Sequence, residues 1–253
     1  MTAHRHPHDT DHQIAHDLAT SAGELLLQLR TTGLEGKDLK DAGDREAHVH
    51  LMAELARRAP ADGVLSEEGA ADGDITAARL SMSRVWIVDP VDGTREYSEP
   101  PRDDWAVHVA LCVDGVATVG AVALPARGLT LATGFPLPTP APYDGPPRLA
   151  VSRTRPPAHA ARLADRLGGE LVPMGSAGAK AMAVVLGEIE VYAHSGGQYE
   201  WDSAAPVAVA VAAGLHVSRL DGSPLVYNRP DPYLPDLLIC RPEFADTAIE
   251  VCA

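Results

Sequence analysis

A short hydrophobic strand that runs into two carboxylates constrains this chain more than any other feature. Residues Val85 to Val88 are apolar and favour burial, and they lead directly into Asp89-Pro90-Val91-Asp92-Gly93-Thr94. An aspartate is costly to bury unless a positive charge compensates it. The proline biases Asp89 toward an extended conformation, so the chain cannot simply continue as a helix. Gly93 permits a close turn, and Thr94 offers an oxygen at a helix start. Two hard oxygen ligands at a rigid strand end therefore predict a site for a divalent cation such as Mg²⁺.

Length, charge and cysteine content narrow the class of protein. A chain of 253 residues with 45% hydrophobic residues can bury a substantial core. No apolar run approaches the roughly 18 residues that span a bilayer, and residues 1–11 lack the apolar core of a signal peptide, so we expect a cytoplasmic protein with no membrane partner. The net charge of −14 argues against a nucleic-acid polymer as partner. It still allows a small phosphorylated substrate, because bound metal ions can supply positive charge. The three cysteines form no CxxC pair and are expected to be free thiols.

Hydrophobic periodicity predicts helices and an antiparallel sheet in the first half of the chain. After a flexible His-rich tail over 1–11, helical spacing indicates a helix over 12–30. A second helix is predicted from Asp44 to about Arg58, followed by a short strand at Val64-Leu65. β-rich runs over 105–113 and 116–124 are joined by Asp114-Gly115, a strong hairpin signal. Residues 129–132 are predicted to add another strand. The apolar face of the second helix is expected to consist of Val49, Leu51, Met52 and Leu55.

A proline-rich stretch divides the chain. Residues 135–147 hold repeated prolines and are either a domain junction or a long surface loop. Beyond it the pattern alternates between strands and helices, which is typical of an α/β unit. We therefore expect an α+β domain over 12–140 with most of the metal ligands, and an α/β domain over 146–253. The predicted elements are strands at 149–152, 171–174 and 190–193, and helices at 158–167, 177–186 and, as the final element, from Asp202 or Ser203 to Ala213.

Acidic residues recur at the predicted ends of three separate elements. They are Glu67-Glu68, the pair Asp89 and Asp92, and Asp202. Taken alone, Glu67-Glu68 is better interpreted as a solvated loop. Asp202 fits a helix N-cap as well as a ligand, and the two roles are compatible because aspartate favours the positive end of a helix. Only the Asp-Pro-Val-Asp-Gly-Thr segment is hard to explain structurally.

Together these clusters resemble the inositol monophosphatase-like superfamily, which comprises Mg²⁺-dependent, Li⁺-sensitive sugar and nucleotide phosphatases. The resemblance covers roughly residues 12–240 and implies the layered α-β-α-β-α sandwich of the inositol monophosphatase and fructose-1,6-bisphosphatase type, an α+β / α/β fold. Family members are often homodimers, so it also implies a homodimer. The motifs that carry it are Ser66-Glu67-Glu68, Asp89-Pro90-Val91-Asp92-Gly93-Thr94, Gly175-Ser176-Ala177 and Trp201-Asp202-Ser203-Ala204-Ala205-Pro206, the last followed by Ala212-Ala213-Gly214.

The resemblance implies specific roles for these residues and two or three Mg²⁺ ions. Glu67 and Thr94 would position the attacking water, and Asp44 would tune it. Asp41 stands where the family usually has threonine, which removes a hydroxyl and bears on the weaker metal site. The metal ligands would be Glu67, Asp89, the Val91 carbonyl, Asp92 and Asp202. The substrate would contact Gly93, Thr94, Arg95, Gly175, Ser176, Ala177, Lys180 and Asp202.

The residues after the first motif favour a nucleotide substrate. Arg95-Glu96-Tyr97 continues Gly93-Thr94 in a way similar to the 3′-phosphoadenosine 5′-phosphate phosphatases of the superfamily. A bisphosphate needs additional positive charge, and the candidates are Arg95, Arg153 and Lys180. Lys180 is equally well interpreted as a solvated helix residue. We expect removal of the 3′-phosphate of 3′-phosphoadenosine 5′-phosphate to give AMP, which clears a by-product of sulfate activation. The alternative is an inositol-1-phosphate or fructose-1,6-bisphosphate phosphatase.

Three other interpretations are weaker. A metal-binding regulatory protein without catalysis is possible in principle, but all positions that turnover needs are intact except Asp41. Five histidines lie near the N-terminus, and His12 and His16 share a helix face, so they could bind Zn²⁺ or Ni²⁺ adventitiously; a frayed polar tail is favoured. Residues 175–180 superficially suggest a nucleotide phosphate loop but lack its Gly-Lys-Ser/Thr ending. The five histidines are His4, His6, His8, His12 and His16.

Overall fold

Two five-stranded sheets, one in each half of the chain, organise the molecule. The computed structural model describes residues 10–71, 77–139, 141 and 143–252. The first sheet has the strand order β1-β2-β3-β4-β5, with β1 and β2 parallel and the remaining neighbours antiparallel. Its strands are β1 (Gly63–Ser66), β2 (Arg84–Asp92), β3 (Ala106–Val113), β4 (Val116–Leu124) and β5 (Leu129–Ala132). The hairpin predicted at Asp114-Gly115 joins β3 to β4, and both residues have positive φ angles.

The second sheet combines a parallel core with an antiparallel edge. Its order is β7-β6-β8-β10-β9, in which β7, β6 and β8 run parallel and β10 pairs antiparallel with both β8 and β9. The parallel part follows from crossover helices, which a parallel connection requires. Its strands are β6 (Arg148–Ser152), β7 (Glu170–Met174), β8 (Val191–Tyr199), β9 (His216–Ser218) and β10 (Tyr233–Cys240).

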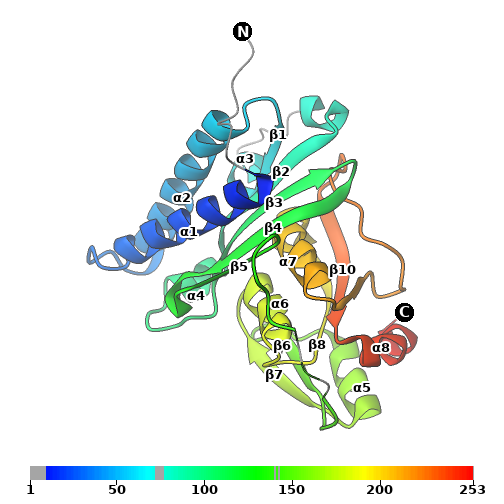
Figure 1. Ribbon diagram of the computed structural model, residues 1–253. Helices are drawn as coiled ribbons and strands as arrows, with labels where there is room; N and C mark the ends of the chain where they lie inside the picture. Colours follow the sequence, from blue (N-terminus) through cyan, green and yellow to red (C-terminus); the bar gives the residue numbers. More distant parts are fainter. Residues whose placement is uncertain (1–9, 72–76, 140, 142, 253) are drawn as a thin grey trace.

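Helices fill three layers around these sheets (Figure 1). The pair α1 (Asp11–Leu29) and α2 (Gly36–Arg58) covers the outer face of the first sheet. The pair α6 (Ala177–Val185) and α7 (Glu200–Ala212) lies between the sheets and packs on both. The pair α5 (Ala158–Leu167) and α8 (Ala245–Cys252) closes the far side of the second sheet. The expected α-β-α-β-α layering is confirmed.

One hydrophobic cluster joins the two halves. It includes Ile87 of β2 and Val122 of β4, the buried faces of α6 and α7, and Tyr192 and Leu237 of the second sheet. The central helices are therefore apolar nearly all round, as expected for helices buried between two sheets. The division into separate domains over 12–140 and 146–253 remains a prediction.

The second helix begins eight residues earlier than predicted, at Gly36 instead of Asp44. Its first two turns contribute Leu39 and Ala42 to the buried face, an apolar signal that the four charged residues of these turns obscured. The predicted apolar face is also wrong in part, because Val49 is 57% exposed whereas Leu51 is buried. Residues two apart lie on nearly opposite sides of a helix, so both could not face the core.

The C-terminal third was predicted least completely. The strand expected at 190–193 continues to Tyr199 as β8, and α7 begins at Glu200, ahead of Asp202. Asp202 is therefore not the N-cap but the third residue of the helix, and its carboxylate accepts a hydrogen bond from the Tyr199 N–H at 2.7 Å. The helix ending at Ala212 is also not the final element, since β9, β10 and α8 follow. Pro235 interrupts the β10 pattern, and the pairing register with β8 shifts at that point, as a bulge at a strand proline requires.

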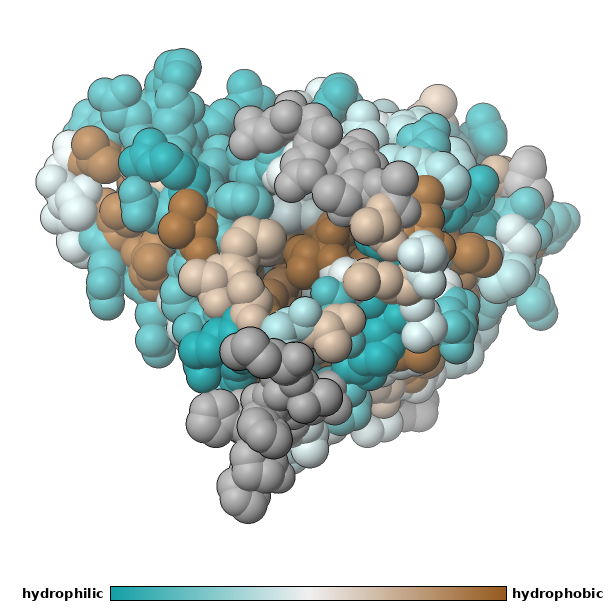
Figure 2. All heavy atoms as spheres, turned by 90° about the horizontal axis from the view of Figure 1, so that it is seen from above, coloured by the Kyte–Doolittle hydropathy of each residue, from teal (hydrophilic) through white to brown (hydrophobic). Residues whose placement is uncertain are grey.

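The face of the molecule in Figure 2 is predominantly hydrophilic. On the face in Figure 2, apolar side chains occupy restricted areas between wider polar ones. The most exposed large apolar side chains among the described residues are Val49, Val116, Val211 and Val226. Within the described residues, no helix has both the length and the apolar character needed to cross a membrane.

Candidate metal centre and its adjoining clefts

A β-bulge places Asp89 and Asp92 on the same face of β2. The two residues are three positions apart, so in a regular strand their side chains would point to opposite faces. On the neighbouring strand their partners are His108 and Ala106, which are only two positions apart. β2 thus carries one extra residue, which restores the alternation and turns both carboxylates the same way. The bulge contains Pro90, which has no N–H to donate, and the Val91 N–H is satisfied by the Asp89 carboxylate at 3.0 Å.

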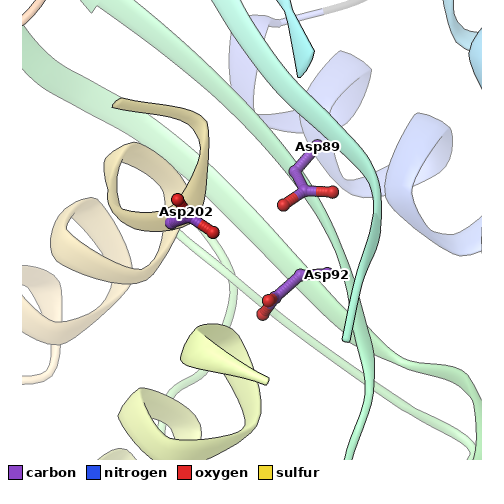
Figure 3. Close-up of side chains that lie close together, drawn as sticks. All are labelled: Asp89, Asp92 and Asp202. Atoms are coloured by element: carbon purple, nitrogen blue, oxygen red, sulfur yellow. The ribbon is translucent and has the colours of Figure 1, made fainter. Parts of the chain in front are cut away.

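Asp202 joins the two strand carboxylates from the first turn of α7. One carboxylate oxygen from each of Asp89, Asp92 and Asp202 lies within 4.8 Å of the others (Figure 3). Asp89 and Asp92 are buried. Such a spacing of hard oxygen atoms suits a divalent cation, which also compensates the cost of burying like charges. The residues present therefore fit the metal site that the sequence predicts.

The turn at the start of α6 holds Asp92 in place. Its carboxylate accepts hydrogen bonds from the Ser176 hydroxyl at 2.5 Å, the Ala177 N–H at 3.1 Å and the Gly178 N–H at 2.6 Å. Burial alone would raise the pKa of Asp92, but His108 and these hydrogen bonds hold that pKa below its ordinary value. Asp92 therefore stays ionised and connects the first sheet to a helix of the central layer.

His108 is buried behind the three clustered aspartates. Its Nδ1 lies 2.9 Å from the Trp201 carbonyl, which can only accept, so this nitrogen carries a hydrogen. Its Nε2 faces Asp92 at 3.2 Å. Burial alone would lower the pKa of His108, but the Asp92 carboxylate raises it above the ordinary value. A protonated imidazole then donates to the Trp201 carbonyl through Nδ1 and forms an ion pair with Asp92 through Nε2. A side chain at Gly178 would place its Cβ 2.0 Å from Nε2, so only glycine fits there.

Glu67 lies beside Asp89, at the start of α3 (Glu67–Ala71). Burial, followed by repulsion from Glu68 and Asp92, raises the pKa of Glu67 to about 7, and a hydrogen bond with Asp89 opposes this rise. Burial and the neighbouring carboxylates raise the pKa of Asp89 well above its ordinary value. Burial and Asp92 likewise raise the pKa of Asp202 to about 7. Buried carboxyl groups that lie close together resist ionisation unless a cation binds among them, as expected for a cation site.

Asp44 and Asp41 lie about one turn apart on α2 but differ in their surroundings. Burial and the nearby Glu68 raise the pKa of Asp44 to about 7, which places Asp44 at the edge of the acidic cluster. Asp41 is exposed and pairs with Lys37 one helical turn away. Asp41 therefore lies at the surface, outside the buried part of the cluster.

Gly93 and Thr94 form the turn after the two aspartates. Gly93 has a φ of 84°, a conformation that favours glycine, and it precedes the short helix α4 (Thr94–Tyr97). The Thr94 hydroxyl donates to the Val91 carbonyl at 3.3 Å, which leaves its oxygen able to accept a further hydrogen bond. The Val91 carbonyl and Thr94 thus lie together at the bulge. This placement is compatible with the expected roles of the carbonyl as a metal ligand and of Thr94 in positioning the water.

The loop expected to bind substrate is occupied by internal contacts. The Gly175 N–H donates to Asp104 at 2.6 Å, while Ser176 and Ala177 hold Asp92. Lys180 is only 5% exposed, so its interpretation as a solvated helix residue is wrong. Its ammonium donates to the carbonyls of Gly175 and Ser176 and lies over the Tyr192 ring, 5.4 Å from the centroid.

Two clefts open beside the acidic cluster and share a basic wall. One, of about 450 Å³, extends past Thr94 and Lys40. The other, of about 300 Å³, reaches Asp92, Asp202 and His194. The residues that line both are Gly93, Ser152, Arg155, Ser176 and Lys180. A phosphate ester at the acidic end can thus extend toward cations at the other.

The three cations proposed for a second phosphate differ in their surroundings. Arg95 is largely exposed at the rim of the larger cleft, with Glu99 3.8 Å away. Arg153 donates to Glu96 at 2.5 Å and lies 3.4 Å from Glu99, so its charge is already compensated. Sequence reasoning missed Arg155, although its place just after a parallel strand, among the residues that follow β6, could have indicated it. It also missed His108, a polar residue within an apolar strand.

The N-terminal histidines divide into two groups. His4, His6 and His8 lie outside the described residues. His12 contacts the Thr133 hydroxyl at 2.7 Å, and His16 stacks on Phe135. Thr10 caps α1, so the predicted tail extends two residues too far into the fold.

The comparisons with known proteins agree with this site. A model of the inositol monophosphatase family matches residues 9–137 and 146–248. The chain therefore belongs to the inositol monophosphatase family, a metal-dependent family of phosphatases.

Within this family, the chain is similar to several individual proteins. The chain is 51% identical to a protein of Mycobacterium leprae named 3′-phosphoadenosine 5′-phosphate phosphatase, over 96% of this chain and 93% of that protein. It is 53% identical to a protein of the same name from Mycobacterium tuberculosis, over 88% of this chain and 86% of that protein. Among solved structures, CysQ from Bacteroides thetaiotaomicron has a TM-score of 0.77 at 24% identity, covering 93% and 98% of the two chains. That likeness concerns the fold.

Proposed function

We propose that this chain is a Mg²⁺-dependent phosphomonoesterase that removes the 3′-phosphate of 3′-phosphoadenosine 5′-phosphate to give AMP and phosphate. The names of the two mycobacterial relatives support the substrate. The structural observation that carries the proposal is the acidic cluster opening into clefts whose shared wall holds Arg155 and Lys180. In a bisphosphate substrate, one phosphate would bind at the acidic cluster and the other at the basic wall.

The metal site would use the carboxylates of Glu67, Asp89, Asp92 and Asp202 and the Val91 carbonyl. Oxygen ligands of this kind suit two or three Mg²⁺ ions. When bound, Mg²⁺ neutralises phosphate charge and lowers the pKa of a coordinated water toward neutrality. The raised pKa values of Glu67 and Asp202 support metal occupancy, because a cation would return these carboxyl groups to their ionised form.

The chain's own groups would direct the water and the ester. Glu67, ionised when metal is bound, would accept a proton from the water on the Asp89 side. The Thr94 hydroxyl oxygen would orient that water from the bulge, and Asp44 would tune it from the edge of the cluster. The Gly93 and Thr94 N–H groups hold phosphate oxygens as the water attacks in line with the leaving oxygen.

The second phosphate of the substrate would bind the basic wall. Lys180 presents a buried ammonium, two of whose hydrogens are fixed by the Gly175 and Ser176 carbonyls, and its third hydrogen is available to a phosphate. Arg155 faces both clefts, and Arg95 at the rim adds charge. A nucleotide with a 5′-phosphate gains these contacts, whereas inositol-1-phosphate has no second phosphate.

Initial-rate kinetics test the proposal. We expect kcat/KM for 3′-phosphoadenosine 5′-phosphate to exceed those for inositol-1-phosphate and fructose-1,6-bisphosphate by at least about tenfold, with activity that requires Mg²⁺. Asp89→Asn should lower kcat by more than about a hundredfold, because even groups behind metal ligands contribute 10- to 100-fold. Asp103→Asn, an exposed acid outside the cluster, is the matched control. A preference for inositol-1-phosphate, or near-full activity of Asp89→Asn, would contradict the proposal.

A further inference from the structure

Glu96 is a buried carboxylate that does not belong to the acidic cluster. It is 6% exposed, and its partner is Arg153, whose Nη2 lies 2.5 Å from the carboxylate oxygen. Glu96 extends from α4, directly after the bulge that carries the metal ligands. Arg153 follows the parallel strand β6 in the other half of the chain. The pair therefore connects the two sheets beside the shared basic wall.

The Glu96 side of this contact is firmly fixed. Arg30 donates to the carbonyl groups of Glu96, Tyr97 and Arg102. The guanidinium of Arg30 also lies over the Trp105 ring, 4.8 Å from its centroid. The segment after β2 is thus held by Arg30, directly after α1, which gives the Glu96 carboxylate a defined position.

Glu96 also fills the space against the loop that leads to Asp92. A Cβ at Gly175 would lie 2.3 Å from the Glu96 Cγ, so this position accepts only glycine. The carbonyl of Gly175 in turn accepts a hydrogen bond from Lys180. Glu96 therefore packs directly on the residue that orients the buried ammonium.

Because Arg153 belongs to the turn Ser152–Arg155, its pairing with Glu96 also restrains this turn. The Arg153 N–H donates to the Met174 carbonyl at 3.1 Å, and the Arg155 N–H donates to the Ser152 hydroxyl at 3.2 Å. Ser152 and Arg155 line both clefts. The direction of the turn depends on where the Arg153 side chain between them is held.

We propose that Glu96 and Arg153 are positioning residues that fix the turn Ser152–Arg155 for recognition of the second phosphate. Arg153 would then act through Arg155 instead of binding the substrate itself. This inference rests on the proposed function. A positioning role predicts that loss of the Glu96 charge raises KM for the bisphosphate. Direct phosphate binding by Arg153 predicts an unchanged or lower KM, because loss of that charge would release Arg153 toward the substrate.

The test compares two substrates that differ only in the 5′-phosphate. For Glu96→Gln with saturating Mg²⁺, we expect KM for 3′-phosphoadenosine 5′-phosphate to rise about tenfold or more with kcat within about twofold, as for loss of a charge-assisted hydrogen bond. The kcat/KM for adenosine 3′-monophosphate should change less than about twofold. Glu96→Asp, which keeps the charge, should recover part of the loss. Glu99→Gln is the matched control, since Glu99 is exposed and lies farther from Arg153.

Two results would overturn the inference. One is an unchanged or lower KM for the bisphosphate in Glu96→Gln, which indicates direct binding by Arg153. The other is an equal fall of kcat/KM for both substrates, which indicates a general structural role. Arg153→Lys provides a second variant if Glu96→Gln does not fold, and the same ratio of substrates applies to it.

Failure of the proposed function is recognised separately, in the wild-type protein. If the wild type does not prefer the bisphosphate over adenosine 3′-monophosphate, the positioning role is tested by inhibition of p-nitrophenyl phosphate hydrolysis by adenosine 5′-monophosphate. A Ki raised about tenfold by Glu96→Gln supports the role. An unchanged Ki contradicts it.

Discussion

At the scale of single residues, the acidic cluster is a set of carboxyl groups whose ionisation opposes folding near neutral pH. The pKa of Glu67, Asp44 and Asp202 is raised to about 7 in the folded chain, chiefly by burial. A carboxyl group with a raised folded-state pKa binds more protons in the folded state than in the unfolded state. Its contribution to stability is full below the unfolded-state pKa near 4 and is lost as the pH rises through the folded-state value.

We therefore predict that the metal-free protein loses stability between about pH 5 and pH 8. The free energy of unfolding should fall by on the order of 1 kcal/mol per pH unit, and Mg²⁺ affinity should rise over the same interval. Asp92 has a lowered pKa, so its effect is confined to more acidic solutions. Urea denaturation in EDTA at several pH values measures the trend, and saturating Mg²⁺ should abolish it. A flat or rising profile in EDTA would show that these groups do not titrate together.

At the scale of elements, the bulge in β2 and the first turn of α6 form one unit around Asp92. The Gly178 N–H holds the carboxylate of Asp92, and the absence of a Cβ at Gly178 makes room for His108. The positions of Asp92 and His108 therefore both depend on Gly178.

Gly178→Ala should disturb both stability and metal binding. The added methyl would lie 2.0 Å from the His108 Nε2, and such overpacking costs about 1–3 kcal/mol. Mg²⁺ affinity should also fall, because Asp92 would be displaced. Denaturation in EDTA and calorimetric titration with Mg²⁺ measure the two effects. Gly69→Ala is the control, since its Cβ would meet nothing nearer than 3.8 Å; equal behaviour of the two variants would exclude the steric argument.

The sequence predicted the helices and strands better than the geometry between them. The strand at 116–124 and the helix at 158–167 were predicted with their observed bounds, because their apolar periodicity is regular. The bulge was not predictable, because its signal is a pairing register with β3 that no local pattern contains. The pairing of Glu96 with Arg153 is equally nonlocal, so Arg153 resembled a free cation in the sequence. Four acidic positions were identified correctly as neighbours only through the family resemblance, since Glu67 and Asp202 have ordinary local explanations.

At the scale of the whole molecule, the proposed metal site would couple cation binding to the packing of the two sheets. Asp89 and Asp92 belong to the first sheet, while Asp202 belongs to a helix of the central layer that packs on both sheets. A cation bound by all three therefore opposes separation of the layers as well as local opening.

We predict that Mg²⁺ stabilises the entire fold in one cooperative transition. At a hundred times its dissociation constant, a ligand specific for the folded state adds about 2.7 kcal/mol, which corresponds to roughly 5–10 °C in Tm for a chain of this size. Differential scanning calorimetry with Mg²⁺ or EDTA measures the shift, and Asp89→Asn should reduce it severalfold. Two separate transitions, of which only one responds to Mg²⁺, would contradict the coupling.

The chain also has a natural position for a split reporter. The segment 136–147 separates the residues that supply Asp89 and Asp92 from those that supply Ser176, Gly178 and Asp202. Each fragment on either side of it holds part of the metal centre, and neither holds all of it. Reassembly of two separately produced fragments would be visible as recovered phosphate release, so hydrolysis would report the association of any two partners fused to them.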